Sequence, residues 1–133
     1  MDMDIEKTLE KPYWLIDIVP ERISEEKGEE YALLQEYCEQ HAEEIRSRFV
    51  FFLLKLNCFH DLKISHDYGE TFSSLDAFPT LAVPSEIYIL IDDRNLLTYD
   101  TQDTYMTLYD PDEKLLKTVE KLVRSEGLFL WEN

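Results

Sequence analysis

The sequence contains little glycine, proline or cysteine, and each shortage excludes a class of protein. Of its 133 residues, 3 are Gly, 5 are Pro and 2 are Cys. So little Gly and Pro excludes a collagen-like or low-complexity chain, and two cysteines cannot build a disulfide framework. No apolar run approaches the roughly 18 residues that a transmembrane helix needs. The acidic start Met1–Asp4 is unlike a signal peptide, so we expect a cytoplasmic protein with reduced cysteines.

Basic residues are also scarce. The chain has 13 Lys and Arg against 29 Asp and Glu, which gives a net charge of −16. Phosphate backbones and anionic lipids repel such a surface, so neither nucleic acid nor a membrane is an expected partner. Apolar material is plentiful, at 44% hydrophobic and 13% aromatic residues. This composition excludes disorder and predicts a single domain over residues 1–133.

Periodicity and turn residues predict an α+β fold. The predicted elements are a frayed arm over 1–12, a strand over 13–19, helices over 28–40 and 42–57, a strand over 62–65, an irregular loop over 67–85, strands over 87–91, 96–99 and 105–109, a helix over 112–126 and a strand over 128–131. We expect a mixed, mainly antiparallel sheet of about five strands, in the order β-α-α-β-β-β-β-α-β, with helices packed on one face.

Two local patterns sharpen this prediction. Alternation in the first strand places Trp14, Ile16 and Ile18 on the face toward the core. Asp110 has the residue type of a helix N-cap, with Pro111 in the first turn and Glu113 completing a capping box. If the strands on either side of the last helix pair in parallel, the crossover should be right-handed.

Four side chains form a candidate metal site: Cys38, His41, Cys58 and His60. Zinc accepts such a mixture of ligands, and two antiparallel helices would bring them together. Both cysteines also lie in apolar stripes, where a free thiol packs as a small hydrophobe. We prefer the packing interpretation and therefore expect no metal and no cofactor.

Other catalytic patterns are incomplete. The dipeptides His60-Asp61 and His66-Asp67 resemble ligands of metal phosphohydrolases, but too few further histidines exist to complete such a centre. A thiolate pair of Cys58 with His60 or His66 would need a cationic neighbour, and acids surround it instead. We therefore predict no catalytic residues.

Acidic residues are concentrated over 61–110, which carries ten acids and two bases. Tyrosines accompany them in the predicted three-stranded meander, and aromatic anchors ringed by charge are typical of protein-binding patches. The alternatives are an acidic surface that serves only solubility and burial of the tyrosines beneath the helices. The candidate partner-binding residues are Tyr88, Asp92, Asp93, Tyr99, Asp100, Asp103, Tyr105 and Tyr109.

The segments 12–20, 105–111 and 125–131 resemble a family of small uncharacterised proteins from anaerobic Firmicutes. The family has no established activity, so the resemblance implies neither catalytic residues nor a cofactor.

Three functions follow from these patterns. The first is a non-enzymatic acidic interaction module, for example an inhibitor that covers a basic protein. The second is a small metal- or thiol-dependent hydrolase built on the Cys, His and Asp residues named above. The third is a self-associating structural or ligand-sensing domain that pairs as a homodimer. The first is the preferred hypothesis.

Overall fold

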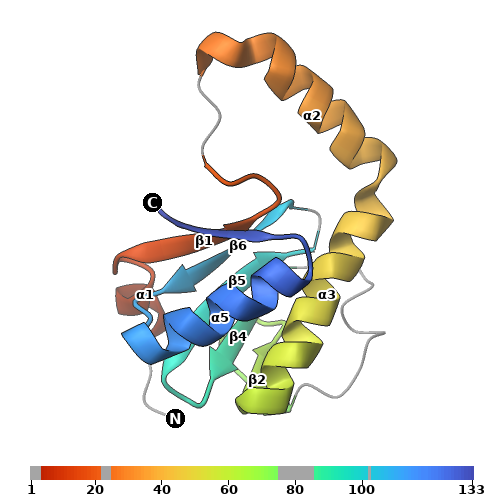
Figure 1. Ribbon diagram of the computed structural model, residues 1–133. Coiled ribbons are helices and arrows are strands. Elements are labelled where there is room, and N and C mark those ends of the chain that lie inside the picture. The colour runs from red at the N-terminus through yellow and green to blue at the C-terminus, as the bar shows by residue number, and fades with distance from the viewer. Residues whose placement is uncertain (1–3, 22–24, 75–85, 102) are drawn as a thin grey trace.

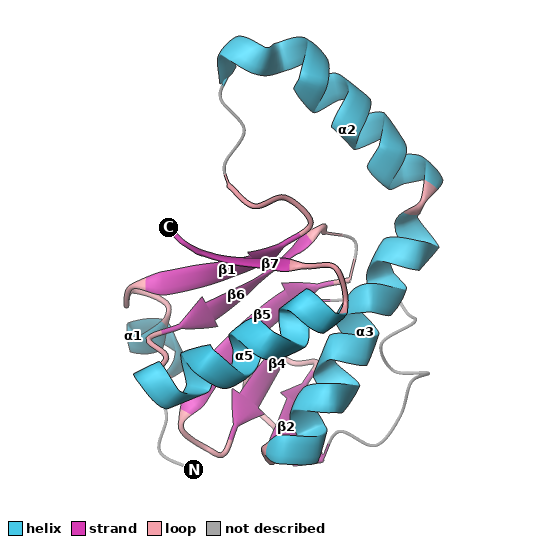
Figure 2. Ribbon diagram, in the orientation of Figure 1, coloured by secondary structure: helices cyan, strands magenta, loops and turns pink. Residues whose placement is uncertain are grey.

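A computed structural model of the protein describes residues 4–21, 25–74, 86–101 and 103–133. The strands are β1 (Tyr13–Asp17), β2 (Leu62–Ser65), β3 (Ser73–Ser74), β4 (Glu86–Ile91), β5 (Asn95–Asp100), β6 (Tyr105–Tyr109) and β7 (Phe129–Glu132). The helices are α1 (Ile5–Thr8), the 3₁₀ turn η1 (Glu25–Lys27), α2 (Gly28–Gln40), α3 (Ala42–Phe59) and α5 (Glu113–Ser125). Figure 2 shows these elements by type. The predicted α+β class is confirmed.

The seven strands of the described residues form one sheet in the order β3-β2-β4-β5-β6-β1-β7, and each neighbouring pair is antiparallel. The prediction of about five strands in a mixed sheet was therefore wrong. The strands before and after α5 do not pair with each other, because β1 lies between them and is antiparallel to both. The meander of β4, β5 and β6 is confirmed.

The core lies between the sheet and the two helices α3 and α5, which cross the same face (Figure 1). From α3 come Ile45, Phe49, Val50, Phe52, Leu53 and Leu56, and from α5 come Leu115, Val119 and Val123. They pack on residues that alternate along the strands, such as Ile16 in β1 and Ile87, Ile89 and Ile91 in β4. Burial of each such side chain contributes about 1.5–3 kcal/mol, so this layer fixes the fold.

Several element boundaries differ from the sequence prediction. β1 ends at Asp17, because the Asp17 carboxylate accepts hydrogen bonds from the backbone N–H groups of Ile18, at 2.6 Å, and of Val19. Its core face is nonetheless as expected, since Ile16 is buried and Ile18 packs against the core. Helix α3 continues to Phe59, two residues beyond the predicted end.

The N-cap of α5 is Asp112, not Asp110. The Asp112 carboxylate accepts a 2.8 Å hydrogen bond from the N–H of Leu115. Asp110 instead adopts a left-handed backbone conformation with φ of 45°, and its N–H donates to the carbonyl of Pro12. It therefore belongs to the turn that leaves β6.

The predicted frayed arm contains the short helix α1, which begins after its N-cap Asp4. Ile5 packs on a small cluster of Tyr88, Leu90 and Leu96 on the sheet face opposite α3 and α5. Of the predicted loop over 67–85, residues 73–74 pair with β2 as β3, and residues 75–85 lie outside the described residues.

Helix α2 stands apart from the rest of the fold (Figure 1). The two predicted helices are confirmed, but α2 has no buried residue, whereas α3 is buried along one face. None of the helices in the described ranges combines the length and apolar character that a membrane crossing requires.

Candidate partner-binding site

One face of the sheet remains accessible on the strands β6, β1 and β7. Side chains directly opposed in antiparallel strands share a face, and the observed register places six large apolar residues on the face opposite α3 and α5. They are Tyr105, Tyr109, Tyr13, Leu15, Phe129 and Trp131, and we call them the open face. Tyr105 and Phe129 are 41% and 42% exposed, and the other four are half-buried.

Specific contacts hold three rings of the open face in place: Tyr13, Tyr109 and Trp131. The rings of Tyr13 and Tyr109 lie 5.8 Å apart between centroids. The amide of Asn133 donates to the Tyr13 hydroxyl at 2.7 Å, and the Trp131 indole N–H donates to the carbonyl of Val19 at 3.1 Å. Pre-positioned aromatic side chains lose little conformational entropy on binding, which favours their use as anchors.

Four carboxylates lie at one end of this face: Asp17, Glu86, Asp100 and Asp103. We call them the acidic rim. Asp17 is directly opposed to Tyr105 on β6 and to Phe129 on β7, and Glu86 is opposed to Asp100. The rim therefore adjoins the two most exposed rings of the open face.

The ionisation of the rim reflects burial first and, at Asp103 and Tyr105, crowded negative charge second. Burial, and then the nearby Asp100 and Glu86, raise the pKa of Asp103. The pKa of Tyr105 is raised by burial and then by Asp103, Asp100 and Asp17. Burial also raises the pKa of Asp17, against the opposing effect of its two backbone N–H donors. A cationic group placed at the rim would relieve this repulsion.

The structure divides the predicted tyrosines into three situations. Tyr105 and Tyr109 lie on the open face. Tyr88 shares that face but is buried in the cluster beneath α1. Tyr99 lies on the other face, opposed to Ile87 and Met106, and stacks on Phe49 in the core. It is 1% exposed, so its assignment to a binding surface was wrong.

The predicted acids also separate. Asp100 and Asp103 belong to the rim, whereas Asp92 and Asp93 lie in the β4–β5 turn, at the other end of strands about 20 Å long. Nδ1 of His60 is 2.5 Å from Asp92 Oδ2, and the N–H of Asp61 donates to Asp92 Oδ1 at 2.8 Å. Lys63 pairs with Asp93 at 3.0 Å. These contacts tie the end of α3 and the strand β2 to the turn, which gives Asp92 and Asp93 a structural role.

The candidate metal residues are not brought together. Cys38 and His41 precede α3, and Cys58 and His60 lie at its far end, about 27 Å away along an 18-residue helix. Within the described ranges, no three His, Cys, Asp or Glu side chains are grouped to hold a metal ion. His41 faces Glu44 at 3.4 Å.

The expectation that both cysteines lie in the core was wrong for Cys58, which is exposed. It follows Leu56 by two residues and so lies on the opposite side of α3. Both thiols are free. Asp67, from the second His-Asp pair, stabilises the loop in which it lies. Its carboxylate accepts hydrogen bonds from Ser65 and from Thr71, and these lower its pKa to about 2.

Sequence reasoning missed six residues of this surface: Tyr13, Leu15, Asp17, Glu86, Phe129 and Trp131. The signal was present in part, because alternation in the first strand already separated Tyr13, Leu15 and Asp17 from the core face. What was absent was the knowledge that β1 lies between β6 and β7, which unites the three strands into one patch.

Comparison with protein-family models, with curated proteins and with solved structures gives no match. The fold and the site together define a small α+β protein with an accessible aromatic sheet face beside a cluster of carboxylates.

Proposed function

We propose that the protein is a non-enzymatic binding module whose partner is a basic protein, and that this partner docks on the open face and the acidic rim. The observation that carries the proposal is the direct adjacency of exposed aromatic rings to a cluster of carboxylates, as in the Asp17–Tyr105 and Asp17–Phe129 pairs.

The two parts of the surface have different tasks. Aromatic residues at the centre of an interface supply most of its binding energy. Charges at its rim accelerate association with an oppositely charged partner and exclude wrong ones. A net charge of −16 adds a long-range field of the same sign. Nucleic acid is disfavoured as the partner, because its phosphates would meet the same carboxylates.

The test is affinity capture from a cell lysate at low and moderate salt, with three variants beside the natural chain. Phe129→Ser removes an anchor from the open face, and Asp103→Asn removes a rim charge. Phe59→Ser is the matched control, because Phe59 is 69% exposed at the end of α3 and lies outside the surface.

We expect enrichment of a basic protein that is lost with Phe129→Ser, weakened by Asp103→Asn and by salt, and retained with Phe59→Ser. Calorimetry with the purified captured protein then gives the affinity of each variant. Capture that is equally sensitive to Phe59→Ser, or that enriches no basic protein, would refute the proposal.

A further inference from the structure

Helix α2 presents an apolar stripe that the rest of the described chain covers only in part, since no residue of α2 is fully buried. Tyr31, Leu34 and Cys38 recur at helical spacing, and Ala42 and Ile45 continue the stripe into α3. The stripe meets the core only at its C-terminal end, where Cys38 is partly buried against it and Ile45 is buried in it; Tyr31 is 55% exposed. A 13-residue helix with so little tertiary packing is marginal in water, and the N-cap residue of α2, Lys27, makes no side-chain capping hydrogen bond. The stripe is therefore suited to packing against another molecule.

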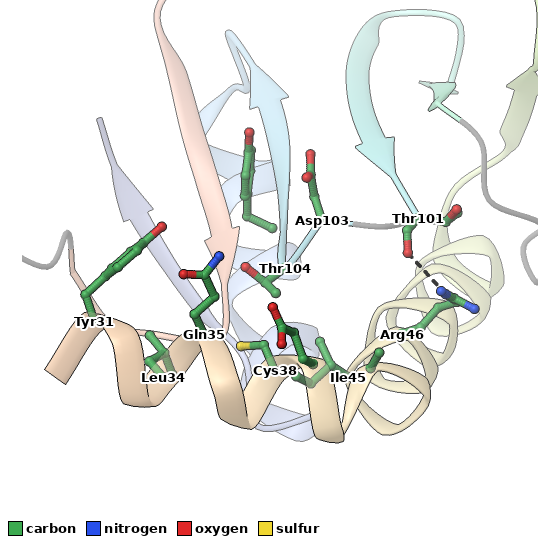
Figure 3. A pocket seen from close by; sticks show the side chains of 12 residues that line it. Tyr31, Leu34, Gln35, Cys38, Ile45, Arg46, Thr101, Asp103 and Thr104 are labelled. Atoms are coloured by element: carbon green, nitrogen blue, oxygen red, sulfur yellow. Dashed lines mark hydrogen bonds between the residues drawn. The ribbon is translucent and has the colours of Figure 1, made fainter. Parts of the chain in front are cut away.

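A cleft of about 450 Å³ lies between this stripe and the rim end of the sheet. One wall is formed by Tyr31, Leu34 and Cys38, and the other includes Asp103, Thr104 and Tyr105. Figure 3 shows side chains of α2 rising into it. Because Asp103 belongs to the rim and Tyr105 to the open face, the cleft is continuous with the proposed docking surface.

One hydrogen bond holds the floor of the cleft together. The guanidinium Nε of Arg46 donates to the carbonyl of Thr101 at 3.1 Å, which ties α3 to the β5–β6 connection (Figure 3). The Cys38 thiol is kept in its neutral form, since burial and then Asp17 raise its pKa. It therefore contributes apolar surface to the stripe.

The charge around the cleft selects among occupants. Residues 25–44 carry eight glutamates and one lysine, a net charge of −7, and Glu39 and Asp103 line the cleft itself. A second copy of this chain would bring the same negative charge against it. An occupant must be apolar on one side to cover the stripe and cationic elsewhere.

We infer that the cleft receives an amphipathic basic helix of the partner, laid against α2, and this inference rests on the proposed function. The ridges of such a helix match the helical spacing of Tyr31, Leu34 and Cys38. Its cationic residues meet Glu39 and Asp103. This mode is helix-in-groove recognition, in which affinity comes from a few apolar anchors spaced by one helical turn.

The test uses a fluorescein-labelled synthetic peptide of about 14 residues, with leucines at helical spacing and lysines elsewhere. One control peptide has the same composition in an order that gives no apolar face, and another has glutamate for every lysine. Binding is measured by fluorescence anisotropy on the full chain, and amide exchange is followed in α2.

The variants are chosen as a matched pair. Leu34→Gln places an amide on the wall of the cleft, whereas Leu33→Gln makes the same change at a residue that is 66% exposed and does not line the cleft. We expect Leu34→Gln to weaken binding of the basic peptide about tenfold, the effect of losing one apolar anchor. Leu33→Gln should leave binding unchanged, and the peptide should slow amide exchange in α2. Circular dichroism checks that both variants remain folded.

The outcomes separate this inference from the proposed function. Equal binding of the two lysine peptides, or equal loss with Leu33→Gln, would overturn the inference. Absence of peptide binding while capture still depends on Phe129 would overturn it and leave the proposed function standing. Leu34-dependent peptide binding without capture of any basic protein would support the cleft and refute the open face as a docking site. A dimer of the natural chain that Leu34→Gln dissociates, seen by light scattering, would assign the cleft to a second copy and overturn the inference.

Discussion

Tyr99 offers a direct test of how the core is built, because its hydroxyl is buried without a hydrogen-bond partner in the described part of the chain. The ring stacks on Phe49 with centroids 5.2 Å apart, and burial holds the pKa of Tyr99 well above its usual range. The substitution Tyr99→Phe keeps the ring and removes only the hydroxyl.

The expected magnitude follows from the cost of an unsatisfied polar group. Leaving a buried hydroxyl unpaired costs about 1–3 kcal/mol, so its removal should raise the free energy of unfolding by about 1 kcal/mol. With an unfolding entropy of about 2.1 cal/mol/K per residue, a chain of 133 residues should gain roughly 3–4 °C in Tm.

Tyr109→Phe is the matched control, since the Tyr109 hydroxyl is hydrogen-bonded to Thr98. This substitution should lower the free energy of unfolding by about 0.5–1.5 kcal/mol. Urea titration and thermal melting of both variants give the comparison. A loss of stability in Tyr99→Phe as large as that in Tyr109→Phe would refute the reasoning and show that the Tyr99 hydroxyl is paired.

Three further predictions concern ionisable groups. Asp103→Asn should raise the free energy of unfolding at pH 7 by about 0.2–1 kcal/mol, the scale of exposed charge pairs. Because the pKa of Asp103 is raised in the native state, its charged carboxylate destabilises that state. Near pH 3 the carboxyl is protonated in the folded and the unfolded chain, so the gain from Asp103→Asn should vanish. Asp92 behaves oppositely: burial opposes the shift, but hydrogen bonds from His60 and from a backbone N–H lower its pKa. Its stabilising effect should be lost in urea titrations as the pH falls below about 4, and His60→Ala should weaken it. The carboxyl of Asp67 should titrate at about 2 in NMR spectra, and Ser65→Ala should raise that pKa.

The parts of the fold that the sequence predicts are those governed by local chemistry. The two helices before β2 and the three strands of the meander follow from apolar spacing and from turn residues, and both are confirmed. The position of β1 between β6 and β7 depends on pairings separated by about a hundred residues. No local sequence pattern encodes such a pairing, because the free energy that stabilises it arises only when the whole sheet has formed. The strand β3, which the sequence does not predict, has only two residues and no apolar alternation that could indicate a strand.

The error at Tyr99 has a specific cause in the register of the β4–β5 hairpin. The predicted strands over 87–91 and 96–99 leave a four-residue connection over 92–95, which would oppose Ile91 to Leu96 and place Tyr99 on the face of Tyr88. Asn95 in fact belongs to β5 and is opposed to Ile91. A register shift of one residue moves every side chain of a strand to the other face, so Tyr99 enters the core.

Acidic residues that are close together in the sequence are separated on the surface of the folded protein. Residues 61–110 hold many acids, but Asp93 is paired with Lys63 and Asp92 with His60, far from the rim. Asp103 instead lies beside Asp100 and Glu86, which add to the effect of burial in raising its pKa, and it lines the cleft together with Glu39 of α2. The rate of association with a basic partner should therefore depend on the position of each charge rather than on the total charge.

In stopped-flow measurements with the captured partner, Asp103→Asn should slow association a few-fold at low salt and less at high salt. Asp93→Asn removes an equal charge from the far end of the sheet and should leave the rate nearly unchanged, because Lys63 already neutralises it. Equal slowing by the two variants would mean that the partner responds only to net charge, and the rim would then have no role in docking.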